Sequence, residues 1–215
     1  MKRNFLFLLA FYTLNAFAQS SDDDDIVDYR NELRFGVKAG FNVSNVYDSE
    51  GESFVADSKA GFAVGGFASI PINKYIGFQP EFMFSQKGFT GNGKFLGTNY
   101  KFVRTTNHID VPLLLQFKPA RYLSILAGVE YSYITSSKDE FKTEFGSVED
   151  KKAFNNDNIQ KNLFGLMLGA DLHIGKYFLI SGRAGWDVMN NRGNGDSDTP
   201  RYKNQWVQLT AGLSF

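Results

Sequence analysis

The sequence contains no cysteine and only two histidines, His108 and His173. Without cysteine, the chain has no disulfide, no thiolate metal ligand and no site for a lipoprotein anchor. Two histidines also restrict catalysis, because hydrolytic schemes commonly place a histidine beside Ser, Asp or Glu. We therefore expect no catalytic residue, no metal site and no cofactor.

An excess of charge of one sign is also absent, since Lys+Arg and Asp+Glu balance at 23 each. This balance argues against a nucleic-acid-binding surface. After residue 18, no apolar run approaches the ~20 residues that a membrane-spanning helix needs. If the mature chain crosses a membrane, it must therefore do so as a closed β-barrel.

The amino-terminal residues have the pattern of a secretory signal peptide. Lys2 and Arg3 precede an apolar run at 5–12, and a small-x-small site ends at Ala18. A membrane anchor helix is the weaker alternative, because the run is shorter than ~20 residues. We expect cleavage between Ala18 and Gln19, which divides the chain into a signal peptide (1–18), a periplasmic tail (19–32) and a barrel domain (33–215).

Alternation of apolar and polar residues dominates the rest of the chain. At its end Leu209, Ala211, Leu213 and Phe215 alternate with polar residues or glycine, as in a strand with one oily face. Similar alternation predicts eight strands, at about 33–44, 60–72, 76–87, 102–118, 122–134, 161–174, 177–188 and 208–215.

The connections between these segments alternate strictly between long and short. The long ones cover residues 45–59, 88–101, 135–160 and 189–204, and the short ones lie near 73–74, 119–121 and 175–176. This alternation is typical of an all-β, eight-stranded antiparallel up-and-down transmembrane β-barrel of the bacterial outer membrane, with periplasmic termini and extracellular long loops. A sandwich with Greek-key crossovers has no reason to alternate in this way.

The polarity of the two faces excludes a soluble lipocalin-like barrel, which has an apolar interior. The inner face here carries charged side chains at Lys38, Glu81, Asp110, Glu130, Asp171 and Arg183. Because unpaired charges away from water are costly, we expect these six to form one ion network that plugs the lumen. Arg183 is the expected hub, since a guanidinium can hold two carboxylates.

The histidines are expected to lie about 20 Å apart in height, from ~3.3 Å per residue and a strand tilt of ~40°. Asp110 shares a face with His108, but we expect a hydrogen-bonded lumen histidine there. An EF-hand loop beginning at Asn194 is not supported, because its sixth position is Thr199 and its twelfth is Gln205. Pro80 and Pro112 fall inside predicted strands, where we expect bulges.

Four segments resemble the strand motifs of the PorT-like outer-membrane β-barrel proteins. They are Gly36-Val37-Lys38-Ala39-Gly40-Phe41-Asn42, Gln79-Pro80-Glu81 with Ser85-Gln86-Lys87-Gly88, Ile109-Asp110-Val111-Pro112-Leu113-Leu114-Leu115, and Gly182-Arg183-Ala184-Gly185. This resemblance implies an eight-stranded barrel. Similarity to outer-membrane barrels also implies that Phe215 is read by the barrel-insertion machinery.

The expected function is structural, adhesive or partner-binding. The partners would be outer-membrane lipid, the insertion machinery and a protein bound at the extracellular loops, of which 135–160 is the longest. A narrow solute channel is an alternative, although eight strands leave room for little more than side chains. An outer-membrane lipid or peptide hydrolase is a further alternative that the histidine count disfavours.

Overall fold

The structure, a computed structural model, describes residues 28–47, 55–95, 98–143, 146–153, 160–190 and 202–215. The expected signal peptide and its cleavage site at Ala18 and Gln19 lie outside these residues, as does much of the EF-hand-like segment. The described residues form a short 3-10 helix and nine strands: η1 (Tyr29–Asn31), β1 (Arg34–Tyr47), β2 (Val55–Pro71), β3 (Ile76–Phe95), β4 (Thr98–Ala120), β5 (Leu123–Thr143), β6 (Gly146–Ala153), β7 (Asn162–Ile174), β8 (Phe178–Asp187) and β9 (Lys203–Ser214).

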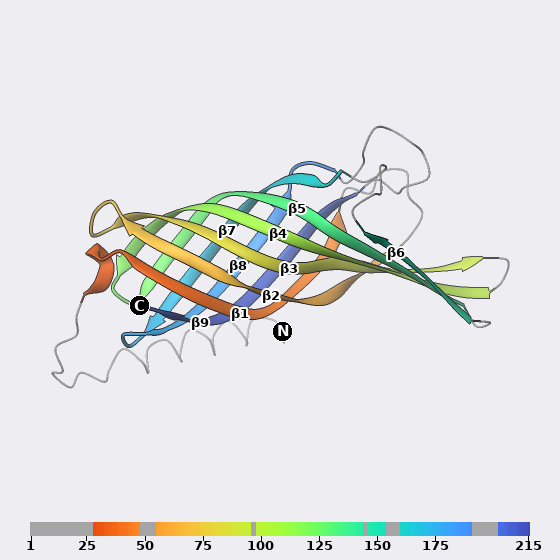
Figure 1. Ribbon diagram of the computed structural model, residues 1–215, viewed down its shortest axis with the longest axis horizontal. Coiled ribbons are helices and arrows are strands. Elements are labelled where there is room, and N and C mark those ends of the chain that lie inside the picture. The colour runs from red at the N-terminus through yellow and green to blue at the C-terminus, as the bar shows by residue number, and fades with distance from the viewer. Residues whose placement is uncertain (1–27, 48–54, 96–97, 144–145, 154–159, 191–201) are drawn as a thin grey trace, which may run out of the picture.

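Eight of these strands close into an antiparallel up-and-down barrel (Figure 1). Each wall strand pairs with its neighbours along the chain, β5 pairs with β7, and β1 pairs with β9 to close the sheet. At this seam the backbone groups of Phe35 and Phe215 exchange two hydrogen bonds of 2.8 Å. The predicted fold class is therefore confirmed. Among the described residues, no helix is long and apolar enough to cross a membrane.

The two faces of the wall follow the period-two pattern of the sequence. Outward-facing Phe41 and Leu115 are 73% and 63% exposed, whereas inward-facing Lys38 and Asn42 are buried. Large apolar side chains cover the outside because successive residues of a strand point to opposite faces. An apolar exterior around a charged interior suits a hydrocarbon surrounding rather than water.

Two segments that the sequence predicts to be long loops, 88–101 and 135–160, consist largely of strand. Much of residues 88–101 belongs to a hairpin in which β3 and β4 remain paired out to Phe95 and Thr98. Within 135–160, β5 continues to Thr143 and β6 folds back on it. These extensions project beyond the barrel wall (Figure 1). They carry no regular apolar face, because nothing outside the membrane requires one, and the alternation that revealed the wall strands is missing.

The bulges expected at Pro80 and Pro112 are also absent. Pairing of β3 with β4 keeps one register on both sides of the two prolines, from Ile76 opposite Phe117 to Phe95 opposite Thr98. Proline lacks only the N–H group, so it interrupts pairing on one side of its strand without requiring an extra residue. The register shifts lie elsewhere: between Ser58 and Ala63, next to His108, and between Phe117 and Ala120.

The short connections confirm the sequence prediction. Residues 72–75 join β2 to β3, 121–122 join β4 to β5, and 175–177 join β7 to β8. Gly175 has a φ of 62°, a conformation that glycine adopts without steric cost. We call this end of the barrel the short-turn end, and the other the long-connection end.

The seam predicts that the backbone of Phe215 contributes more to barrel stability than its side chain. Replacing Phe215 with Pro removes the N–H that bonds to Phe35 O, and should lower the free energy of unfolding by about 1–3 kcal/mol. Phe215→Ala keeps both backbone bonds and should cost less. Urea titration of each refolded variant measures the difference, and equal losses would contradict a seam held by backbone pairing.

Candidate functional site

Four charged side chains from four strands meet inside the barrel and form what we call the Arg183 cluster. The Arg183 guanidinium lies 2.6 Å from Asp171 and 2.8 Å from Glu81, and Lys38 Nζ lies 2.6 Å from the other Glu81 oxygen. All four side chains are at most 1% exposed. The cluster balances two cations against two carboxylates, which is the condition for burying ions at an acceptable cost.

Glycine makes room for the largest member of this cluster. A Cβ built on Gly169 would lie 2.5 Å from Arg183 Cδ and 2.9 Å from its Nη1. Gly185 is similar, because a Cβ there would lie 2.3 Å from the ring of Trp206. Both glycines therefore leave space in the lumen for a bulky neighbour across the sheet.

A second group, the Lys87 cluster, holds the remaining predicted carboxylates. Lys87 Nζ lies 2.9 Å from Glu130 and 3.3 Å from Asp110, and 3.7 Å from the centroid of the Trp206 ring. Trp206 in turn packs with a buried apolar group of Leu114, Leu126 and Met167. Charged and apolar side chains together fill the lumen, as the narrow interior of an eight-stranded barrel requires.

The structure therefore places all six predicted residues in the lumen, but the single expected network is wrong. The ion pairs of the described lumen side chains fall into two groups, and Asp110 and Glu130 belong with Lys87 rather than with Arg183. Lys87 is not among the six predicted lumen residues. It lies at the last position of the predicted third strand, where the sequence offered no sign that the strand continues.

The surroundings of His108 do not form a hydrolytic triad. Ser132 Oγ lies 2.5 Å from Asp110 Oδ1 and 2.8 Å from His108 Nδ1. A serine has one proton, and donation to the carboxylate leaves His108 Nδ1 as the donor to Ser132. His108 then cannot accept the serine proton at this nitrogen, as a general base must. Its Nε2 lies 2.8 Å from Thr106 Oγ1, so the ring is fully hydrogen-bonded.

His173 lies elsewhere, at the short-turn end of β7, where its Nε2 is 3.4 Å from Ser124 Oγ. The two histidines therefore belong to different sites. Within the part of the chain that the structure describes, no group of three or more His, Cys, Asp or Glu side chains is placed to hold a metal ion.

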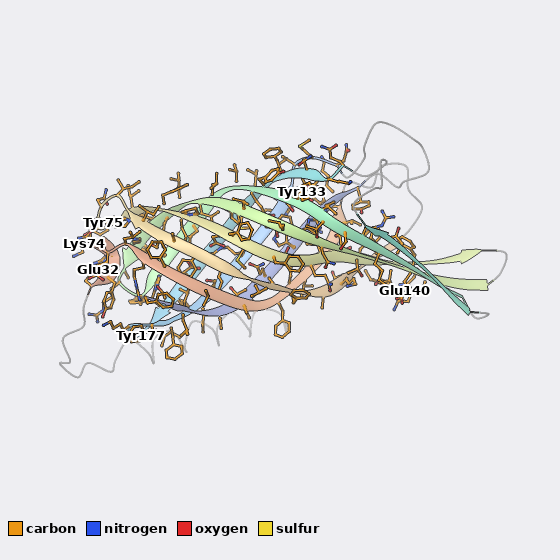
Figure 2. The ribbon with its side chains drawn as sticks, in the orientation of Figure 1. Glu32, Lys74, Tyr75, Tyr133, Glu140 and Tyr177 are labelled. Atoms are coloured by element: carbon orange, nitrogen blue, oxygen red, sulfur yellow. The ribbon has the colours of Figure 1, made fainter. Side chains whose placement is uncertain are left out.

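The long-connection end carries a sheet that continues past the barrel wall. β5 pairs with β7 only as far as Tyr133, and from Ser136 to Thr143 it pairs with β6 instead. We call the parts of β2 to β6 beyond this point (55–58, 88–95, 98–107, 134–143 and 146–153) the projecting sheet. Figure 2 shows Glu140 on this sheet and Tyr133 back at the wall.

This sheet is held by specific contacts at its base. Arg104 forms a two-pronged ion pair with Asp139, with nitrogen–oxygen distances of 2.8 Å and 2.7 Å. Phe89 and Tyr202 pack edge to face, 5.1 Å between centroids, in an apolar group with Val46. A paired guanidinium and a buried aromatic group fix the direction in which the sheet leaves the barrel.

The segment before β1 is tied to the short-turn end. Asp28 pairs with Arg30 at 2.7 Å and with Lys74 at 3.3 Å, and the hydrogen bonds from Arg30 hold the pKa of the Asp28 carboxyl well below its usual value. Lys118 Nζ donates to Arg30 O at 3.1 Å. The part of the predicted tail that is described, including η1, is thus fixed against the rim of the barrel.

Together, the apolar exterior and the charge-filled interior define a small outer-membrane-type barrel. The chain matches the model of the outer membrane protein beta-barrel domain over residues 17–191, and it belongs to that family. Membership makes it a protein of the bacterial outer membrane, surrounded by lipid. No curated protein matches the chain.

Solved structures with a similar fold come from several bacteria. The attachment invasion locus protein Ail of Yersinia pestis is 18% identical over 86% of this chain and 99% of its own, with a TM-score of 0.47. Neisserial surface protein A is 14% identical over 84% and 95%, with a TM-score of 0.47. OprG of Pseudomonas aeruginosa is 15% identical over 85% and 95%, also with a TM-score of 0.47. Likeness at this level assigns no function to the chain.

Two lumen substitutions are predicted to weaken the barrel to a similar extent. Arg183→Leu leaves Glu81 and Asp171 without their shared cation, and Lys87→Met does the same to Asp110 and Glu130. Each should lower the free energy of unfolding by roughly 3–5 kcal/mol, the usual cost of breaking a buried pair. Urea titration in detergent, followed by tryptophan fluorescence, measures the loss.

Lys101→Met is the matched control, because Lys101 is exposed at the long-connection end and a surface change should cost less than about 1 kcal/mol. An Arg183→Leu variant as stable as the parent would refute a structural role for the lumen charges.

Proposed function

We propose that this protein is a non-enzymatic outer-membrane barrel that binds a partner through its projecting sheet. The observation that carries the proposal is the edge of β6. In the part of the chain that the structure describes, β6 pairs with β5 alone and stands at the end of the sheet order. An unpaired edge offers a row of backbone donors and acceptors to an extended peptide.

The firm base of the sheet supports the same proposal. A binding strand is more effective when its geometry exists before the partner arrives, because less ordering accompanies binding. The Arg104–Asp139 pair and the Phe89–Tyr202 packing provide this order at the point where the sheet leaves the wall. In the proposed orientation this end is extracellular and both termini are periplasmic, as in other barrels with tight periplasmic turns.

The two alternative functions have less support. A solute channel needs an open path, whereas buried ion pairs and Trp206 fill the lumen. A hydrolase needs a reachable nucleophile, whereas Ser132 is 1% exposed and donates to a carboxylate. Within the family we propose the PorT-like type, since the four segments that carry this resemblance lie in the strands β1, β3, β4 and β8, and only Gly88 falls beyond the wall.

Removing the tip of the β5–β6 hairpin is predicted to abolish partner binding and leave the barrel intact. The variant replaces residues 141–148 with Asn-Gly, which suits a two-residue hairpin between the paired residues Glu140 and Glu149 and keeps the Arg104–Asp139 pair. Heated and unheated gel migration should show a closed barrel as in the parent. A photocrosslinking residue that replaces Asp150 or Lys151 in the parent should form adducts with the partner protein on whole cells.

The matched control places the same crosslinker at Phe164, which faces outward from the wall of β7, and should give no protein adduct. Equal adducts at Phe164, or unchanged cell-surface binding after hairpin removal, would contradict the role of the β6 edge.

Assembly in cells gives a separate prediction for Phe215. If the insertion machinery reads the terminal aromatic, deleting Phe215 should lower the amount of protein in outer-membrane fractions several-fold, whereas Phe215→Tyr should not. Quantitative immunoblotting of fractionated cells makes the comparison, and amino-terminal sequencing of the same fraction tests a mature start at Gln19. Equal levels of the deletion variant and the parent would count against recognition of the aromatic.

A further inference from the structure

The three tight turns at the short-turn end share one local sequence. Each carries a basic residue followed by tyrosine: Lys74-Tyr75, Arg121-Tyr122 and Lys176-Tyr177. The turns join β2 to β3, β4 to β5 and β7 to β8, so two wall strands separate the first turn from the second and the second from the third, and four strands (β8, β9, β1 and β2) separate the third from the first. The pairs are therefore spread around the rim rather than gathered at one point.

The tyrosines stand at the boundary of the apolar exterior. Tyr75, Tyr122 and Tyr177 are 52%, 54% and 48% exposed, and the next outward residues include Ile76 and Phe178 at 45% and 63%. Figure 2 shows Lys74, Tyr75 and Tyr177 at this end. A tyrosine has an apolar ring and a polar tip, which suits the depth where hydrocarbon meets headgroups.

The basic side chains at this depth are open to the surroundings. Lys74 is 48% exposed and has one ion pair, with Asp28, which Arg30 already binds more closely. Arg121 is exposed, and no ion pair or hydrogen bond joins its side chain to another described residue. Lys176 Nζ lies 5.2 Å from the Tyr177 ring centroid, and the neighbouring Tyr177 raises the pKa of the ammonium group.

Positive charge dominates this end of the molecule. The described residues from 28 to 34 and the three turns contain two acidic side chains (Asp28 and Glu32) and five basic ones (Arg30, Arg34, Lys74, Arg121 and Lys176). Lys118, near the end of β4, adds a sixth basic side chain at this end. Arg34 and Lys118 are buried and bind backbone carbonyls, and Arg30 pairs with Asp28. The three turn residues therefore carry the outward positive charge, against one exposed carboxylate, Glu32.

We propose that the three turns form a ring that binds the phosphate groups of anionic phospholipids in the leaflet at this end. A compact soluble anion could reach only one turn, because at least two strands separate any two of the turns. Phospholipids, in contrast, surround the barrel and bring a phosphate to every turn at once. Basic residues near an anionic membrane surface each add to the attraction, and tyrosine beside each one fixes its depth.

Native mass spectrometry of the purified full chain in detergent tests the proposal. The probes are dioleoyl phosphatidylglycerol and dioleoyl phosphatidylcholine, which share acyl chains and differ in headgroup charge. The parent should retain phosphatidylglycerol preferentially. The variant Lys74→Gln/Arg121→Gln/Lys176→Gln keeps all three tyrosines and should lose about a hundredfold of this preference, since each of the three basic residues contributes about fivefold.

Lys59→Gln/Lys101→Gln/Lys138→Gln is the matched control, because it removes three positive charges near the long-connection end and should retain the preference. Heated and unheated gel migration establishes that each variant is a closed barrel, and Lys74→Arg/Lys176→Arg should behave as the parent. Equal retention of the two lipids by the parent, or equal loss in the control, would overturn the proposal. Displacement of the lipid by millimolar inorganic phosphate would also overturn it, since the ring would then bind a free anion.

Discussion

Burial of charge inside a narrow barrel is the constraint on which the rest of the structure depends. The wall must be apolar outside, so the polar half of every strand points inward, and eight strands leave no room for bulk water to solvate it. Arg183 meets this constraint by holding Glu81 and Asp171 at 2.8 Å and 2.6 Å. Gly169 has no side chain because the guanidinium occupies that space. Strand register, the positions of the glycines and the pairing of the lumen charges therefore all follow from the need to bury these charges.

The same constraint separates the two proposed binding surfaces from the barrel wall. Since the lumen is filled by side chains that stabilise the wall, a function that varies among such proteins has to lie at the ends, where loops and turns meet water. The two ends differ in kind. Among the described residues, the long-connection end carries a sheet whose β6 edge is unpaired, and the short-turn end carries side-chain charge beside tyrosine. The first suits a polypeptide partner and the second suits a phosphate-bearing surface.

The sequence predicts the fold wherever the membrane imposes an apolar–polar pattern on the strands. Phe41, Leu115 and their equivalents alternate with polar residues because lipid lies on one side of the wall, and this periodicity revealed the fold. Lys87 was missed as a hub because its partners come from β4 and β5, and a cross-strand ion pair leaves no local signal. The bulges predicted at Pro80 and Pro112 were wrong for a different reason. A proline lacks its N–H and so interrupts pairing on one side only, and the register continues unchanged.

The projecting sheet was not predicted because neither of its faces contacts lipid, so neither has to be apolar. Once a hairpin leaves the membrane, its strands need only backbone pairing and a few anchors such as Arg104–Asp139. Residues in such a region need not alternate between apolar and polar, and substitutions there do not destabilise the barrel wall. A segment that looks like a polar loop next to a strongly alternating strand can therefore be a continuation of that strand. In a small barrel this is also where a new binding surface disturbs the buried charges least.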